Sequence, residues 1–101
     1  MTEALTNSLT EESLFELLSL ECRIDTDGTV RYFNSNGESH RVYGASIEYS
    51  DGSRAWYQNG QLNRLDGPAF VGADGSCEWY INGKELTRAE WQQAVTSMRI
   101  A

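Results

Sequence analysis

The residues that commonly carry out catalysis are sparse in this chain. It has one histidine, His40, in the stretch ESHRVY, and a Ser-His-Asp or Cys-His arrangement would have to use it. A similar stretch later in the chain has Asn63 at the same place, which favours a surface position in a repeated unit. The two cysteines, Cys22 and Cys77, match no metal or redox spacing, and whether they lie close in space is left open. We therefore expect no catalytic residues, no metal and no other cofactor, in a protein that is not an enzyme.

The stretch DTDGT, from Asp25 to Thr29, has the acids of a calcium-binding loop but not its spacing. An EF-hand would need an acid or amide in place of Arg23 and a glutamate in place of Asn34. The glycines likewise form neither a G-x-G-x-x-G nor a Walker pattern. Asp-Gly as a turn is the better interpretation of this stretch.

The uneven distribution of charge is the clearest functional signal. The chain of 101 residues has a formal net charge of −7, yet residues 1–27 alone hold seven acids and one base, a net of −6. This charge disfavours direct binding to nucleic-acid phosphates and favours attraction to a basic protein. The alternative is an ordinary solvated face, with the first acids well placed at a helix N-terminus. The candidate partner-binding residues are Glu11, Glu12, Glu16, Glu21, Asp25 and Asp27.

Turn-forming dipeptides recur through the chain with a period of 23 to 24 residues. Asn-Gly occurs at 36–37, 59–60 and 82–83, and Asp-Gly occurs at 27–28, 51–52 and 74–75. Both dipeptides suit type I′ turns, in which the two central residues have positive φ. The segments between them are short and carry aromatic residues, as strands do. The spacing predicts about three 23-residue β-hairpin repeats over residues 24–86, with one extra residue before the first Asn-Gly.

Strand alternation assigns the aromatic residues of the repeats to two faces. It places Trp56 in one column with Trp79, and Tyr57 in another column with Tyr80. The recurring arginines either form a stripe for an anionic ligand or stack on these rings and balance nearby acids. We favour the second interpretation, because residues 28–101 have a net charge of only −1. An alternative binding surface on the sheet would use Arg54, Trp56, Tyr57 and Arg64.

Two segments have the periodicity of helices. Residues 9–21 predict an acidic amphipathic helix whose apolar stripe consists of Leu14, Leu17 and Leu18. Residues 87–98 predict a C-terminal helix that begins with a capping box of Thr87 and Glu90. The sequence thus predicts a single α+β domain over residues 1–101 that is mainly β, an antiparallel sheet of repeats capped by a helix at each end.

The pattern W-Y-x-N-G-x-x-x-R-x-D-G-P-A, from Trp56 to Ala69, resembles short repeats of small bacteriophage and prophage proteins. Its period and its aromatic and Asn-Gly residues are also similar to those of MORN repeats, which form β-hairpin sheets. The resemblance covers residues 24–91, most closely 47–91, and the first unit departs from it in YFNSNGESHRVYGA. It implies a scaffold without a catalytic set. In a phage setting it implies an accessory factor that takes over or inhibits host functions, including host defence.

We therefore expect a non-enzymatic protein-binding factor of the host cytoplasm. It would use its acidic surface to occlude a basic site on a host protein, such as a defence complex (an anti-CRISPR-type role) or a nucleic-acid-handling complex. The alternative is a small-ligand or carbohydrate-binding module that uses exposed Trp and Tyr side chains on the sheet. We expect neither direct nucleic-acid binding nor membrane insertion, and no signal peptide is visible. Unprotected sheet edges leave a homodimer open.

Overall fold

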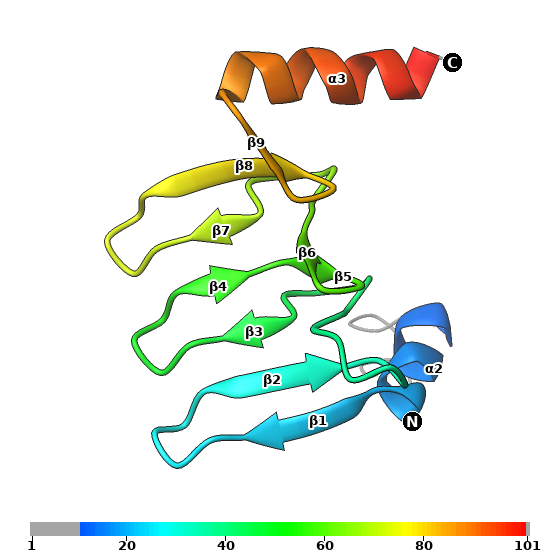
Figure 1. Cartoon of the computed structure of the whole chain (residues 1–101), viewed down its shortest axis with the longest axis vertical. Coiled ribbons are helices and arrows are strands. Elements are labelled where there is room, and N and C mark those ends of the chain that lie inside the picture. The colour runs from blue at the N-terminus through cyan, green and yellow to red at the C-terminus, as the bar shows by residue number, and fades with distance from the viewer. Residues whose placement is uncertain (1–10, 101) are drawn as a thin grey trace, which may run out of the picture.

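A seven-stranded antiparallel sheet dominates the structure, a computed structural model that describes residues 11–100 (Figure 1). The strand order is β1-β2-β3-β4-β7-β8-β9, which follows the chain except for an excursion into a second, two-stranded sheet of β5 and β6. Helix α2 (Glu11–Ser19) lies at the end of the sheet near β1 and β2, and helix α3 (Arg88–Ile100) lies at the opposite end, beyond β8 and β9 (Figure 1). The strands are β1 (Glu21–Ile24), β2 (Val30–Phe33), β3 (Ile47–Glu48), β4 (Arg54–Ala55), β5 (Tyr57–Gln58), β6 (Gln61–Leu62), β7 (Phe70–Val71), β8 (Cys77–Ile81) and β9 (Lys84–Leu86).

The Asp-Gly dipeptides form the turns that join β1 to β2, β3 to β4, and β7 to β8. Their glycines have φ angles of 94°, 94° and 88°, whereas the aspartates are not among the described residues with positive φ. The prediction of type I′ turns is therefore wrong at these sites. The physical reason is local, because each aspartate carboxylate accepts a hydrogen bond from the backbone N–H two residues later, at 2.8 to 3.0 Å. This bond favours a three-residue turn in which only the glycine is left-handed.

The Asn-Gly dipeptides form turns of two kinds. Asn59 and Asn82 have a φ of 50° and are followed by left-handed glycines, which is the geometry expected of type I′ turns. In the first Asn-Gly turn only Gly37 is left-handed. There the Asn34 carbonyl accepts the Gly37 N–H, and the Asn34 N–H donates to the Glu38 carbonyl. The extra residue of this segment is therefore accommodated by a longer turn.

Helix α2 (Glu11–Ser19) is shorter than the predicted helix of residues 9–21. Residues 9 and 10 lie outside the described residues. At the other end the helix stops at Ser19, and Glu21 already pairs with Phe33 as the first residue of β1. Strand pairing therefore begins at residue 21, three residues before the predicted start of the repeats. Neither helix of the described chain is long and apolar enough to cross a membrane.

Helix α3 (Arg88–Ile100) begins with the predicted capping box. The Thr87 N–H donates to the Glu90 carboxylate at 2.9 Å, and the Glu90 N–H donates to the Thr87 hydroxyl at 3.1 Å. Trp91 attaches the helix to the sheet, because its ring lies 4.7 Å from that of Trp79 and its Nε1–H donates to the Arg64 carbonyl at 2.8 Å. The helix thereby covers the end of the sheet formed by β8 and β9.

The buried interior is made mostly of small side chains. Its buried members are Thr29, Ala45, Ser46, Ile47, Ser53, Ala55, Asn63, Ala69 and Val95. The predicted ring-on-ring columns are not formed, since the close aromatic pairs among the described residues are Tyr49 with Phe70 and Trp79 with Trp91. Instead, the prediction that arginines stack on the aromatic rings is confirmed for two rings. The Arg41 guanidinium lies 4.3 Å from the centre of the Tyr32 ring, and that of Arg64 lies 3.8 Å from the Trp56 ring.

Each of these arginines is held by its own loop. Arg41 donates to the Ala45 carbonyl at 3.4 Å, and Arg64 donates to the Pro68 carbonyl at 3.1 Å. A glycine lies on the other side of the guanidinium in both loops. A Cβ atom added at Gly44 or Gly67 would stand 2.8 Å from the Cζ atom of the arginine. The guanidinium is therefore packed between an aromatic ring and a glycine that has no room for a side chain.

Replacement of this glycine should displace the arginine. We expect Gly67→Ala to lower the free energy of unfolding by about 1 to 3 kcal/mol, the usual effect of overpacking. Urea unfolding followed by tryptophan fluorescence measures the loss, and the native emission should also change as the guanidinium leaves the Trp56 ring. Leu65→Ala, in the same loop but at an exposed side chain, is the control and should be close to neutral. Equal stability of Gly67→Ala and wild type would contradict the packing argument.

Candidate functional site

Glu16 of α2 binds the backbone of a distant loop. One of its carboxylate oxygens accepts the Val42 N–H at 2.6 Å, and the other accepts the Tyr43 N–H at 3.1 Å. The contact joins residues 26 and 27 positions apart and attaches the N-terminal helix to the loop that carries Arg41. Glu16, a predicted partner-binding residue, therefore serves as an internal anchor. No signal in the sequence indicates this role, because the partner groups are backbone amides.

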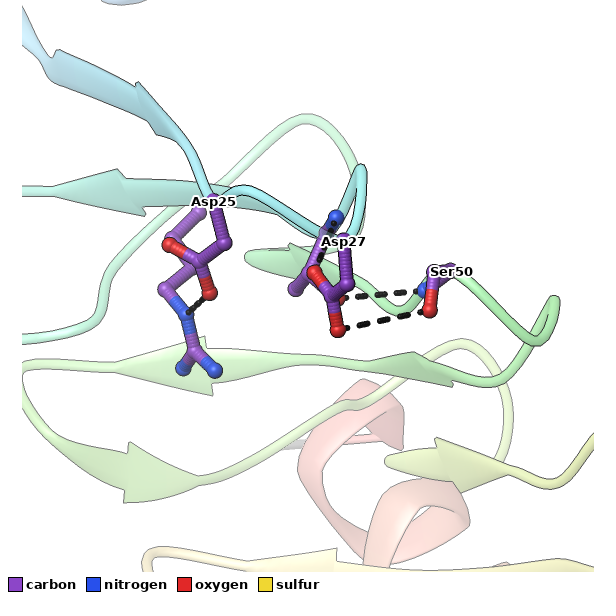
Figure 2. Close-up of polar contacts among 5 residues, drawn as sticks. Asp25, Asp27 and Ser50 are labelled. Carbon is purple, nitrogen blue, oxygen red and sulfur yellow. Dashed lines mark hydrogen bonds and ion pairs between the residues drawn. The ribbon is translucent and has the colours of Figure 1, made fainter.

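Two further predicted partner-binding residues also make internal contacts. Asp25 pairs with Arg31, and Asp27 is bonded to Ser50 of the next turn along the sheet; Figure 2 labels Asp25, Asp27 and Ser50. The Asp25 carboxylate accepts from Arg31 Nε at 2.8 Å. The Asp27 carboxylate accepts the Thr29 N–H at 2.9 Å and the Ser50 hydroxyl at 3.4 Å. The bond from the Thr29 backbone, supported by the Thr29 and Ser50 hydroxyls, lowers the pKa of Asp27 from its ordinary value of 3.8. Both acids hold turns in place.

The remaining acids lie on the surface beside apolar side chains. Glu21 is on β1 rather than on the helix, and it forms an exposed ion pair with Arg23 at 3.7 Å. Glu11 and Glu12 lie in the first turn of α2 and are exposed. They line a shallow hollow of about 440 Å³ together with Leu14, Phe15 and Leu18.

The apolar face of α2 is open to solvent. Phe15 and Leu18 are 74% and 79% exposed, and Leu14 is 49% exposed. Leu17 alone of the predicted stripe is partly buried. The stripe of Leu14, Leu17 and Leu18 therefore does not pack onto the sheet as an ordinary amphipathic helix would. We call the surface formed by Glu11, Glu12, Leu14, Phe15 and Leu18 the α2 face.

The predicted binding residues of the sheet are only partly brought together. One groove of about 910 Å³ is lined by Arg54, Trp56 and Arg64. It is bounded by the loops that carry Arg41 and Arg64 and by α3. Tyr57 does not line it. Its backbone N–H and carbonyl are both bonded to the hydroxyl of the buried Ser46, and burial raises the pKa of the Tyr57 phenol. One face of the Trp56 ring is covered by Arg64, so that face is not free to stack against a sugar.

His40 has the place that the sequence predicts for it. Its Nδ1 accepts the Asn59 N–H at 3.0 Å, and the Oδ1 of Asn63 accepts the Asn82 N–H at 2.8 Å. Each side chain thus supports the next Asn-Gly turn along the chain. The Nδ1 atom of His40 is therefore engaged in a structural hydrogen bond.

Neither the metal-ligating residues nor the cysteines form a cluster. Among residues 11–100 no group of three or more His, Cys, Asp or Glu side chains could hold a metal ion. Cys22 and Cys77 are free and lie on β1 and β8. These strands are five spacings apart in the sheet, on the order of 24 Å, so a disulfide between them is excluded.

Comparison of the chain with protein-family models, with curated proteins and with solved structures found no match. The geometry of the surfaces described above is therefore the basis for assigning a function.

The bond between Asp27 and the Thr29 backbone predicts a pH dependence of stability. The folded-state pKa is lowered, so the contribution is present above pH 3.8 and is lost as the pH falls through the folded-state value. Asp27→Asn keeps an oxygen acceptor but cannot titrate. Between pH 7 and pH 3, we expect the urea midpoint of Asp27→Asn to fall less than that of wild type. Identical falls in the two proteins would rule out this contribution.

Removal of the Glu16 carboxylate should release α2. Hydrogen bonds to charged groups contribute about 1.5 to 3 kcal/mol, so Glu16→Ala should speed exchange of the Val42 and Tyr43 amides by about 10- to 100-fold. Hydrogen exchange followed by NMR measures this effect for each amide. Glu12→Ala removes a carboxylate from the same helix and is the control, for which these two amides should be unchanged. Unchanged exchange in Glu16→Ala would show that the contact does not form in solution.

Proposed function

We propose that this protein is a non-enzymatic protein-binding factor whose recognition element is the α2 face. The scaffold that presents it is proposed to consist of three 23-residue β-hairpin repeats of the kind found in phage repeat proteins. The single observation that carries the proposal is the exposure of Phe15 and Leu18, 74% and 79%, on a helix that is itself fixed in place by Glu16. Exposed apolar side chains on an anchored helix are typical of a binding surface.

The chemistry of the α2 face indicates the partner. Its centre consists of Leu14, Phe15 and Leu18, and Glu11 and Glu12 lie beside them. The complementary surface is an apolar groove with basic side chains at its rim, into which a helix can insert. Aromatic and leucine side chains would supply most of the affinity, and the two glutamates would speed association and select for a basic rim.

This mechanism differs from one in which carboxylates alone imitate nucleic-acid phosphates. Glu16, Asp25 and Asp27 are bonded within the protein. We therefore do not base the proposal on an acidic surface made of all six predicted residues. The binding would occlude a basic and apolar site on a host protein. A defence or nucleic-acid-handling complex fits this description, as the resemblance to phage repeat proteins implies.

Capture from host lysate by paired variants tests the proposal. Phe15→Ser with Leu18→Ser removes the apolar centre at two exposed positions and should leave folding unchanged. We expect the wild-type protein to retain a protein with a basic rim, and the double variant to bind that isolated protein at least 100-fold more weakly. Glu11→Gln with Glu12→Gln should weaken binding about 3- to 10-fold, and more at low salt, since screening already weakens exposed charge pairs at physiological salt.

The matched control is Ile24→Ser, which changes an exposed apolar side chain of β1 that belongs neither to the α2 face nor to the groove, and this variant should bind as wild type does. The circular dichroism spectra of all variants should coincide. A partner that binds the Phe15→Ser, Leu18→Ser variant as tightly as wild type would refute the α2 face as the recognition element.

A further inference from the structure

The loop that binds Glu16 has a counterpart in the second half of the sheet. Residues 41–45 and 64–68 fold back on themselves in the same way: in each loop the arginine donates to the carbonyl four residues later and packs against the glycine three residues later. Both loops begin with a backbone N–H that donates to a tyrosine carbonyl, Arg41 to Tyr57 and Arg64 to Tyr80. Val42 and Tyr43 of the first loop correspond in position to Leu65 and Asp66 of the second.

The first loop shows what such a loop can bind. Its two successive N–H groups, from Val42 and Tyr43, receive both oxygens of one carboxylate. Adjacent backbone amides that converge on one anion form a receptor that needs no side chain. The receptor therefore persists wherever the backbone geometry is repeated, whatever residues are present.

The second loop has this geometry without an internal carboxylate. Within residues 11–100 the N–H groups of Leu65 and Asp66 donate to no other group. Both residues line the groove described above. The groove also contains four arginines against two acids, a local excess of positive charge in a protein of net charge −7. They are Arg41, Arg54, Arg64 and Arg99, with Glu48 and Asp66.

We propose that the loop of residues 64–68 is a carboxylate-binding site that takes an aspartate or glutamate side chain of a partner polypeptide. The Leu65 and Asp66 N–H groups bind the two carboxylate oxygens, as Val42 and Tyr43 bind those of Glu16. Leu65 and Met98, each partly exposed at the groove, contact the apolar neighbours of that side chain. Arg99 contributes attraction from α3.

The charge around the loop favours a carboxylate over a phosphate. The Asp66 carboxylate, whose side chain is 81% exposed, pairs with Arg64 Nε at 2.9 Å and lies next to the site. A dianionic phosphate would meet this negative charge more strongly than a single carboxylate would. The precedent within the same chain is also a carboxylate. This site is separate from the α2 face, so its failure and the failure of the proposed function are distinguishable.

An NMR titration with N-acetylglutamate α-amide tests the site, and N-acetylglutamine α-amide is the neutral control. We expect saturable downfield shifts of the Leu65 and Asp66 amide protons with the glutamate compound, in the millimolar range, and no such shifts with the glutamine compound. Val42 and Tyr43 should not respond in wild type, because Glu16 occupies them. In Glu16→Ala the same two amides should respond, which calibrates the measurement.

Two variants separate binding from folding. Asp66→Asn removes the nearby negative charge and should tighten binding about threefold, whereas Arg99→Gln should weaken it by a similar factor. The proposal is overturned if the Leu65 and Asp66 amides show no saturable shift. The most direct contradiction would be a Glu16→Ala protein in which Val42 and Tyr43 respond and Leu65 and Asp66 do not. Equal shifts with the glutamate and glutamine compounds would also overturn it, since the site would then not select a carboxylate.

Discussion

The packing of an arginine guanidinium between an aromatic ring and a glycine is the contact on which the rest of this structure depends. The buried side chains are mostly alanine and serine, which alone would bury little apolar area. The rings of Tyr32 and Trp56 supply larger surfaces, and Arg41 and Arg64 cover them. The same arginines fix the course of their loops through carbonyl groups. Each of the two arginines therefore both covers a ring and fixes the backbone of its loop.

Several carboxylates in this protein bind its own backbone. Asp27, Asp51 and Asp74 each receive an amide of their own turn, and Glu16 receives two amides of a distant loop. These four acids are therefore bonded within the protein and are not free for a partner. The surface that remains on α2 combines apolar side chains with two glutamates, so the binding proposed for it is not purely electrostatic.

Features set by neighbouring residues could be predicted, and features set by distant contacts could not. The Asn-Gly turns at 59–60 and 82–83, the Thr87 and Glu90 capping box and the correspondence of His40 with Asn63 depend on local spacing. Strand alternation predicted columns of rings, but it could not show that Tyr57 and Tyr80 belong to different sheets, or that an arginine rather than a second ring covers Tyr32 and Trp56. The Glu16 anchor was not predictable either, because any glutamate of α2 offers the same carboxylate to the same kind of amide.

The order of strands has a mechanical consequence. The sheet follows the chain from β1 to β9 with one excursion, and the described ends lie at opposite ends of the sheet (Figure 1). Most pairings therefore join segments close in sequence, which shortens the loops that folding must close and favours rapid folding. Tension applied between α2 and α3 would load the antiparallel pairs one after another. Such a chain should lengthen under force in steps of one strand pair, while the pairs not yet opened keep their arginines stacked.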